Sequence, residues 1–355
     1  MPTPLPLILD VDTGIDDSLA LLYAAASPDA DLVAVTCVSG NIDAEHVGIN
    51  TRAVLELAGR TDVEVAMGRP IPLVRPLETT PETHGPQGLG YAELPPPSKA
   101  LSDRHAVDLI LEEARRRPGE ITLVTLGPLT NLAVAVLQEP ALPGLLKGYA
   151  LMGGAFGVSG NTTPTTEWNI HCDPEAAQIV FRAWAAAMTI DPSIPRPLVL
   201  GLDVTEQARI EPEHVMRLAR RAGSTPDDSI DLDGGDPMAA GGSVASNPVV
   251  RYVADALRFY FEFHRQFDGF YGAFIHDPLA VAAALDRGLV QTEELFVDVE
   301  TRGELTTGMT VADRRGLTGR APNLDVATTA DVATFLDRLI ERVGGLAADR
   351  TNVAR

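Results

Sequence analysis

Apolar runs that end in polar residues alternate with helical patterns along most of the chain. Short runs typical of buried strands lie at residues 7–9, 32–38, 63–67, 121–126, 149–152 and 198–202. Helical patterns lie between or after them, among them residues 44–58, 102–116, 212–221 and 249–267. Strands that alternate with helices form parallel sheets covered on both faces. The pattern therefore predicts an α/β fold with a mostly parallel, doubly wound (Rossmann-like) central sheet.

The C-terminal part of the chain continues this pattern less regularly. We expect strands near Leu295, Gly308 and Val326, and a terminal helix from about Thr329 to Val343. No repeat of fixed period and no dividing linker is found. Residues 1–355 are therefore predicted to form a single domain, with extra helices around the edge of the sheet that holds the active site.

Two segments lack this periodicity. Residues 68–97 are rich in Pro, Gly and Thr and contain His84, as expected of a long binding loop or lid. Residues 224–247 carry five aspartates and no Lys or Arg, which favours a flexible acidic insertion. The spacing Asp231-x-Asp233 hints at a second calcium loop, but the full EF-hand register is missing.

Composition narrows the possible partners. The formal net charge is -21 and the sequence pI is about 4.6, so phosphate backbones and anionic lipids are repelled. We therefore expect no nucleic-acid or membrane partner, and a substrate that is neutral or held through a cation. The two cysteines and the absence of a signal-peptide pattern or membrane-spanning run favour a cytoplasmic location, although one disulfide is conceivable.

Four carboxylates crowd the first strand end. Asp10 and Asp12 follow the apolar run, and Asp16 and Asp17 precede a helix that begins near Ser18. In open α/β sheets this edge binds ligands. An all-oxygen cluster suits Ca²⁺ or Mg²⁺. Favourable interaction with the helix dipole explains Asp16 and Asp17 equally well, but it does not explain the two strand-side residues.

Two more groups carry candidate chemistry. The stretch Glu167-Trp-Asn169, with Asn161 before it, suits a sugar, although Asn is also common in turns. His276 precedes Asp277-Pro278, where the aspartate could simply cap a helix, but the histidine could donate a proton to a leaving group. His84 is a weaker candidate of the same kind. The remaining helical histidines are interpreted as surface or structural residues: His46, His105, His214 and His264.

The opening motif alone leaves alternatives open. Asp10-Val-Asp12-Thr13 also matches the start of haloacid-dehalogenase phosphatases, in which Asp10 would attack phosphorus with Mg²⁺ present. In those enzymes the second acidic pair comes much later in the chain than Asp16-Asp17. A calcium-dependent nucleoside or sugar binder without catalysis is a third reading.

The full set of motifs resembles the inosine–uridine-preferring nucleoside hydrolases. The motifs occur in the family's order and are Asp10-Val-Asp12-Thr-Gly14-Ile-Asp16-Asp17, Gly40-Asn41, Gly127-Pro-Leu-Thr130-Asn131, Met152-Gly-Gly154, Glu167-Trp-Asn169, Asp173-Pro-Glu-Ala-Ala177, Gly201-Leu-Asp-Val-Thr205 and His276-Asp277-Pro278. The resemblance implies hydrolysis of the N-glycosidic bond of purine or pyrimidine ribonucleosides to ribose and free base.

The resemblance also implies a site with one Ca²⁺ per subunit. The ligands would be Asp12, Asp17, Asp277 and the backbone carbonyl of Leu126, completed by water and the ribose 2′- and 3′-hydroxyls. The substrate would be held by Asp16 and Asn169 at those hydroxyls, by Asn161 and Glu167 at the 5′-hydroxyl, and also by Met152. Asp10 would support the metal carboxylates.

The resemblance also implies roles in catalysis. Asn41 would orient a metal-activated water and Asp12 would accept its proton. His276 would protonate or polarise the departing base, and His84 could also reach it. The segment Phe267 to Phe274 would face the base, and the choice between purine and pyrimidine stays open. Family members are expected to be homodimers or homotetramers.

Overall fold

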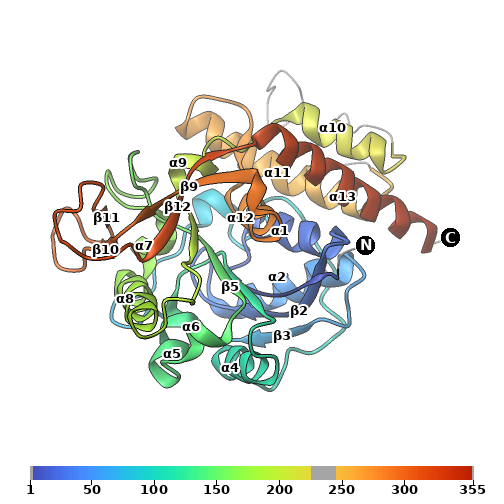
Figure 1. Cartoon of the computed structure of the whole chain (residues 1–355). Coiled ribbons are helices and arrows are strands. Elements are labelled where there is room, and N and C mark those ends of the chain that lie inside the picture. Colours follow the sequence, from blue (N-terminus) through green and yellow to red (C-terminus); the bar gives the residue numbers. More distant parts are fainter. Residues whose placement is uncertain (1–2, 225–244, 354–355) are drawn as a thin grey trace.

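A twisted eight-stranded sheet forms the centre of the computed structural model, which describes residues 3–224 and 245–353 (Figure 1). In spatial order its strands are β3 (Glu64–Met67), β2 (Ala30–Cys37), β1 (Leu5–Val11), β4 (Thr122–Thr125), β5 (Gly148–Met152), β6 (Leu198–Leu200), β12 (Leu324–Ala330) and β9 (Val290–Leu295). Every neighbouring pair is parallel except β12 and β9. The predicted α/β fold with a mostly parallel sheet is confirmed.

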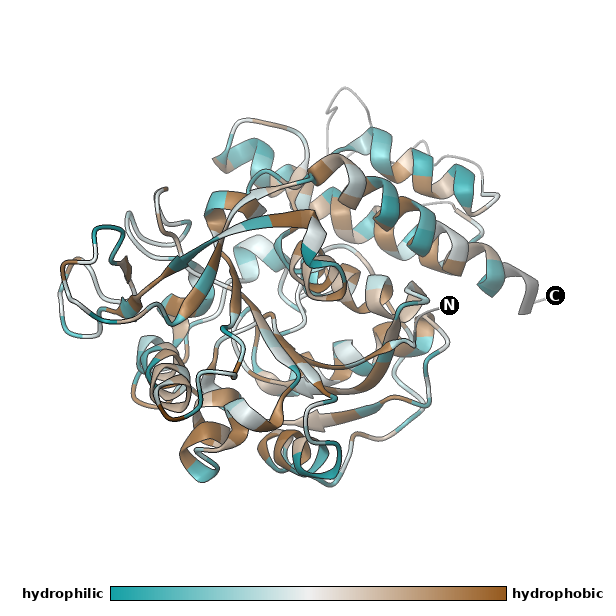
Figure 2. Ribbon diagram, in the orientation of Figure 1, coloured by the Kyte–Doolittle hydropathy of each residue, from teal (hydrophilic) through white to brown (hydrophobic). Residues whose placement is uncertain are grey.

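Helices cover both faces of the sheet. Those whose apolar residues join the first core are α1 (Ile15–Ala26), α2 (Ala44–Leu57), α10 (Pro212–Arg221), α11 (Pro248–Phe267), α12 (His276–Leu285) and α13 (Val332–Val353). Those that form the second core are α4 (Ala106–Arg116), α5 (Thr130–Gln138) and α8 (Pro174–Ile190). Their inward sides are the more hydrophobic ones in Figure 2.

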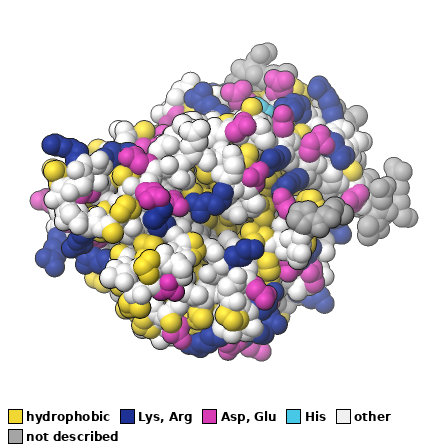
Figure 3. Space-filling model, in the orientation of Figure 1, with side chains coloured by type: hydrophobic (Ala, Val, Ile, Leu, Met, Phe, Trp, Pro, Cys, Tyr) yellow, Lys and Arg dark blue, Asp and Glu magenta, His cyan; other side chains and the backbone are white. Residues whose placement is uncertain are grey.

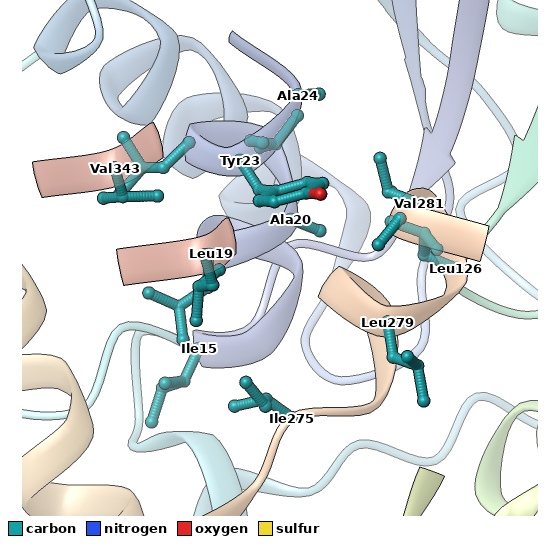
Figure 4. Packing of buried hydrophobic residues seen from close by; sticks show 14 of the residues in the cluster. Ile15, Leu19, Ala20, Tyr23, Ala24, Leu126, Ile275, Leu279, Val281 and Val343 are labelled. Atoms are coloured by element: carbon teal, nitrogen blue, oxygen red, sulfur yellow. The ribbon is translucent and has the colours of Figure 1, made fainter. Parts of the chain in front are cut away.

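Successive side chains along a strand point into two separate hydrophobic cores, one on each face of the sheet. Leu7 and Leu9 of β1 belong to the first core, and Ile8 between them belongs to the second, because successive strand side chains point to opposite faces. Helix α1 packs on α12 and α13 within the first core, where Tyr23 lies among residues of these helices such as Val343 (Figure 4). This packing fixes the first turns of α1 and α12 relative to one another.

Short elements complete the chain. They are α3 (Pro81–His84), α6 (Leu142–Leu145), α7 (Trp168–Cys172), α9 (Leu202–Thr205), η1 (Arg287–Leu289), the pair β7 (Arg209–Ile210) and β8 (Ala273–Phe274), and the hairpin β10 (Val297–Val299) and β11 (Thr310–Ala312). The predicted loop 68–97 therefore contains one short helix, α3.

Several sequence predictions need correction. Helix α4 begins at Ala106 rather than at residue 102, because the ring nitrogen of His105 caps it by accepting from the backbone N–H of Val107 at 3.2 Å. The terminal helix begins at Val332 rather than Thr329, because β12 stays paired with β9 as far as Ala330. Both cysteines are free and buried, so the conceivable disulfide is absent.

The predicted acidic insertion at 224–247 lies mostly outside the described residues. Its last residues are described: the Asn247 side chain caps α11 by accepting from the backbone N–H groups of Val249 and Val250. Within the described ranges, no helix is long and apolar enough to cross a membrane. The face shown in Figure 3 carries acidic and basic side chains interspersed.

Candidate active site

A cavity of about 530 Å³ opens beside the carboxyl ends of the parallel strands. Residues that follow β2, β4 and β5 line it, as expected for the ligand-binding edge of an open α/β sheet. Its acidic lining residues are Asp16, Glu82, Glu167, Glu206, Asp268 and Asp277. No Lys or Arg belongs to this lining in the part of the chain that the structure describes. The cavity therefore suits a neutral or cationic ligand.

Three carboxylates from distant parts of the sequence meet at one side of the cavity. Asp16 and Asp17 lie in the first turn of α1 and Asp277 in the first turn of α12, with one oxygen of each within 4.8 Å of the others. Burial, followed by repulsion from Asp17, raises the pKa of Asp16 to about 7. Burial, followed by repulsion from Asp16, raises the pKa of Asp277 well above its usual range. A bound cation would relieve this repulsion.

Asp12 lies next to this trio and has one free oxygen. Its Oδ2 accepts from the backbone N–H of Asn41 at 2.8 Å, while Oδ1 is buried without a hydrogen-bond partner in the described structure. The backbone of Gly40 and of Gly127 lies so close to the carboxylate that a Cβ at Gly127 would come within 2.7 Å of Oδ1. Burial, followed by repulsion from Asp17, raises the pKa of Asp12. An orphaned anionic oxygen beside three other carboxylates fits a hard cation.

Asp17 is oriented by the turn between β1 and α1. Its carboxylate accepts from the backbone N–H groups of Gly14 at 2.9 Å and Asp12 at 3.2 Å, and from the side-chain amide of Asn41 at 3.2 Å. The carbonyl of Leu126, which also lines the cavity, accepts from the Asn169 side chain at 2.6 Å. The structure thus brings the four expected metal-binding groups to one region, although Asp12 is not in the tightest trio.

Three of the expected sugar-binding residues, Asn161, Glu167 and Asn169, lie in α7 or in the loop before it. Glu167 caps this helix: its carboxylate accepts from the backbone N–H groups of Asn169 at 2.8 Å and Ile170 at 3.1 Å, and also from Gly154 at 2.9 Å. Asn161 accepts from the backbone N–H of Trp168 at 3.0 Å. All the predicted sugar-binding side chains line the cavity, and Met152 lies within 3.4 Å of the Asn169 amide.

Two of the predicted histidines line the cavity with their rings buried. His84 Nδ1 accepts from the backbone N–H of Ile15 at 3.1 Å, which leaves the proton of the neutral ring on Nε2. His276 Nδ1 lies 2.8 Å from the Thr205 hydroxyl. Burial is the main cause that lowers the pKa of each ring to about 3. The smaller cause is electrostatic repulsion from His264 in both cases, and from His84 as well in the case of His276.

Residues 7–337 match the family model of the inosine-uridine preferring nucleoside hydrolase. The chain belongs to this family. It is 38% identical to the pyrimidine-specific ribonucleoside hydrolase RihA of Salmonella newport (strain SL254) over 340 residues, 96% of this chain and 98% of that protein. Like its family, the chain is a hydrolase that acts on N-glycosyl bonds.

Solved nucleoside hydrolases share the whole fold. The purine-preferring ribonucleoside hydrolase from Gardnerella vaginalis superimposes with a TM-score of 0.83 at 30% identity, covering 97% of this chain and 99% of that one. An inosine-guanosine nucleoside hydrolase superimposes with a TM-score of 0.80 at 27% identity, covering 96% and 99%.

The position of Asp10 does not fit the alternative interpretation, a phosphatase in which Asp10 attacks phosphorus. Its side chain is fully buried and is not among the residues that line the cavity. Oδ1 accepts from the Thr36 hydroxyl at 2.6 Å and from the Asn131 amide at 2.8 Å. Membership of a hydrolase family likewise counts against the reading as a binder without catalysis.

Sequence reasoning expected the segment Phe267 to Phe274 to face the base, and Phe267 and Phe274 do line the cavity, but it missed the part of this wall that α11 supplies. His264 was interpreted as a surface or structural residue, but it is 5% exposed and lines the cavity with Tyr260, Phe263 and Phe274. The signal that could have found this wall is the dense aromatic run of residues 259–274 in a chain with only 5% aromatic residues. A helix end rich in aromatic residues suits a flat heterocycle.

Proposed function

We propose that the chain is a calcium-dependent ribonucleoside hydrolase that prefers pyrimidine nucleosides. The observation that carries the proposal is the meeting of Asp16, Asp17 and Asp277 beside the unpartnered oxygen of Asp12. The pyrimidine preference is supported by the 38% identity to a relative named as pyrimidine-specific, against 30% for one named as purine-preferring.

The proposed calcium ligands are Asp12, Asp17, Asp277 and the carbonyl of Leu126. Ca²⁺ accepts six to eight oxygen ligands, so substrate hydroxyls and water could complete its shell. When bound, it would lower the pKa of a water and fix the ribose hydroxyls. The same cation would compensate the charge that these buried carboxylates otherwise share.

Asp12 would be the general base. Its Oδ1 has no hydrogen-bond partner in the described structure and could accept a proton from the attacking water. The bond from the Asn41 backbone holds the other oxygen, so the free one has a fixed direction. The Asn41 side chain would orient the water.

The ribose would lie in the cavity between the carboxylate trio and the residues around α7. Asp16 and Asn169 would bind the 2′- and 3′-hydroxyls, while Asn161 and Glu167 would bind the 5′-hydroxyl, with Met152 beside the sugar. Breaking the N-glycosidic bond develops positive charge on the ribose, as in other glycoside hydrolyses. The carboxylates around the sugar would stabilise that charge in the transition state.

The departing base would be polarised by histidine N–H groups. If the Thr205 hydroxyl donates to Nδ1 of His276, the ring keeps its proton on Nε2 and can donate a hydrogen bond to the base. His84 has the same tautomer, because its Nδ1 already accepts a backbone N–H. Either ring could therefore stabilise negative charge on the leaving base.

A substrate panel tests this proposal directly. Purified protein is treated with a chelator, and release of base from uridine, cytidine, inosine and adenosine is measured before and after Ca²⁺ is restored. We expect hydrolysis only with Ca²⁺, fastest on the two pyrimidine nucleosides. Undiminished hydrolysis in the chelator would contradict the calcium dependence, and faster purine release would contradict the preference alone.

Subunit association belongs to the same proposal. On the family resemblance we propose a homodimer or homotetramer in the cytoplasm. Light scattering coupled to size exclusion measures the assembly directly, and a monomer at micromolar concentration would contradict it.

A further inference from the structure

His264 lies in the last turn of α11 and is paired with a carboxylate. Its Nδ1 lies 2.7 Å from Oδ2 of Asp268, one helical turn later and directly after the helix. Both residues line the cavity, and the histidine is only 5% exposed. None of the proposed metal, water or ribose contacts uses either residue.

The carboxylate fixes the tautomer of this ring. An ionised Asp268 can only accept, so Nδ1 carries the proton and Nε2 of the neutral ring is left as an acceptor. Burial lowers the pKa of His264 in spite of this partner, which favours the neutral ring. Its Nε2 is buried and has no hydrogen-bond partner among the described residues. An unsatisfied buried acceptor is costly unless a ligand supplies the missing donor.

The surroundings of His264 suit a flat heterocycle. Phe270 stacks on the ring at 5.4 Å between centroids, and Phe274 meets it edge-on at 5.0 Å. Tyr260 lies at 4.7 Å and also packs against His84 across the wall at 5.5 Å. His84 offers a donor at Nε2, whereas His264 offers an acceptor. This wall can therefore distinguish the polar edges of a base as well as bury its faces.

We propose that His264, held by Asp268, is a specificity-determining residue that accepts a hydrogen bond from an N–H group on the edge of the nucleobase. The proposal rests on the proposed ribonucleoside substrate. It selects bases with an amino or ring N–H group in reach, such as the 4-amino group of cytosine, over analogues that lack one. Asp268 is a positioning residue, because it acts only through the ring.

Paired substrates and variants test this assignment. Cytidine and 2-pyrimidinone riboside differ only in the 4-amino group, and kcat/KM is measured for both with the Ca²⁺-loaded protein. For each protein, kcat/KM for cytidine is divided by kcat/KM for 2-pyrimidinone riboside. The wild-type ratio divided by the ratio of His264→Phe gives a quotient in which the intrinsic difference in leaving-group ability cancels. We expect this quotient to be about 10 or more, as for a lost buried hydrogen bond. A quotient within about twofold of 1 would overturn the proposal.

Asp268 provides a second test if the phenylalanine variant does not fold. Asp268→Ala removes the acceptor that orients Nδ1–H, whereas Asp268→Asn keeps a carbonyl oxygen there. The alanine variant is expected to lose most of the preference for cytidine, and the asparagine variant to restore it. Equal loss in both variants, or loss in neither, would contradict the positioning role.

A matched control is available on the surface. His46 pairs with Asp43 through Nδ1 at 2.7 Å in the same way, but it is exposed and is not among the residues that line the cavity. His46→Phe is expected to leave the substrate ratio unchanged, and a changed ratio there would overturn the assignment to His264. If wild type cleaves neither nucleoside nor 4-nitrophenyl riboside, the proposed function fails and this proposal with it. Cleavage by wild type with an unchanged quotient in His264→Phe overturns this proposal alone.

Discussion

The backbone N–H of Asn41 donates to Oδ2 of Asp12 at 2.8 Å and thereby connects the loop after β2 to the residue that follows β1. The side-chain amide of the same asparagine reaches Asp17 at 3.2 Å. One residue therefore orients two buried carboxylates, and it leaves Oδ1 of Asp12 as the oxygen without a partner. That free oxygen is the atom to which the base role is assigned.

Asp12→Asn tests this role. The amide keeps the shape of the side chain but cannot accept the proton from water, so we expect kcat on uridine to fall by about 10²- to 10⁴-fold. Asn41→Ala keeps the backbone bond to Asp12 and removes only the side chain, so its kcat should fall less. Steady-state kinetics on uridine measure both. Turnover by Asp12→Asn close to that of wild type would rule out the base role.

The cation site predicts a gain in stability when Ca²⁺ is added. Binding to the folded state alone stabilises it by about 2.7 kcal/mol at a concentration 100 times the dissociation constant. We therefore expect the melting temperature to rise when Ca²⁺ is added to chelator-treated protein, and Asp277→Asn to abolish the rise. Differential scanning calorimetry measures it.

A buried aspartate elsewhere controls for general damage. Asp173 caps α8 and accepts from the Thr130 hydroxyl at 2.8 Å, but it does not line the cavity. Asp173→Asn should lower the melting temperature and keep the response to Ca²⁺. A response lost in both variants would show that the shift reports fold integrity rather than a site at Asp277.

His84 predicts a loss of stability in acid. Burial lowers its pKa to about 3, against about 6.5 in an unfolded chain. Below pH 6.5 the unfolded chain binds a proton that the folded chain does not, so the contribution of His84 is complete above pH 6.5 and falls as the pH drops. The loss approaches about 1.4 kcal/mol per pH unit.

His84→Gln isolates this contribution from that of the buried carboxylates. The variant is expected to be less stable than wild type at pH 7.5, with a difference that shrinks by pH 5.5. Urea unfolding at several pH values gives both free energies. Parallel curves for the two proteins would mean that His84 takes up its proton equally well in the folded state.

His276 predicts dependence on the leaving group. Uracil departs poorly without a hydrogen-bond donor, whereas nitrophenolate needs little help. His276→Ala should therefore slow uridine hydrolysis far more than hydrolysis of 4-nitrophenyl riboside. Thr205→Val should show a weaker form of the same pattern, and Thr205→Ser should restore wild-type behaviour. Equal losses on both substrates would argue against the role of His276 at the base.

The sequence predicted the part of the site whose residues lie close together in the chain. A strand, a turn and the start of a helix bring Asp12 and Asp17 together, and the carboxyl ends of parallel strands share one edge of the sheet. The resemblance to a family added Asp277, whose distance from Asp17 depends on how α12 packs on α1. Local periodicity alone contains no information on that packing.

His264 shows why the α11 part of the aromatic wall was missed. Its position in an amphipathic helix is equally compatible with a surface or a buried ring. Only the placement of the last turn of α11 beside β8 and the cavity decides between them. The predicted start of the terminal helix was wrong for a similar reason, because pairing with β9 extends β12 as far as Ala330.

The acidic lining predicts that nucleotides are excluded. A 5′-phosphate carries nearly two negative charges at neutral pH and would approach Glu167, in a lining with other carboxylates and with no Lys or Arg among the described residues to receive it. Juxtaposed like charges cost several kcal/mol, so kcat/KM for uridine 5′-monophosphate should be lower than for uridine by about 10³-fold or more. 5′-O-Methyluridine separates charge from size: it should be cleaved much faster than the monophosphate. Comparable rates for the nucleotide and uridine would place the 5′ end of the substrate away from these carboxylates.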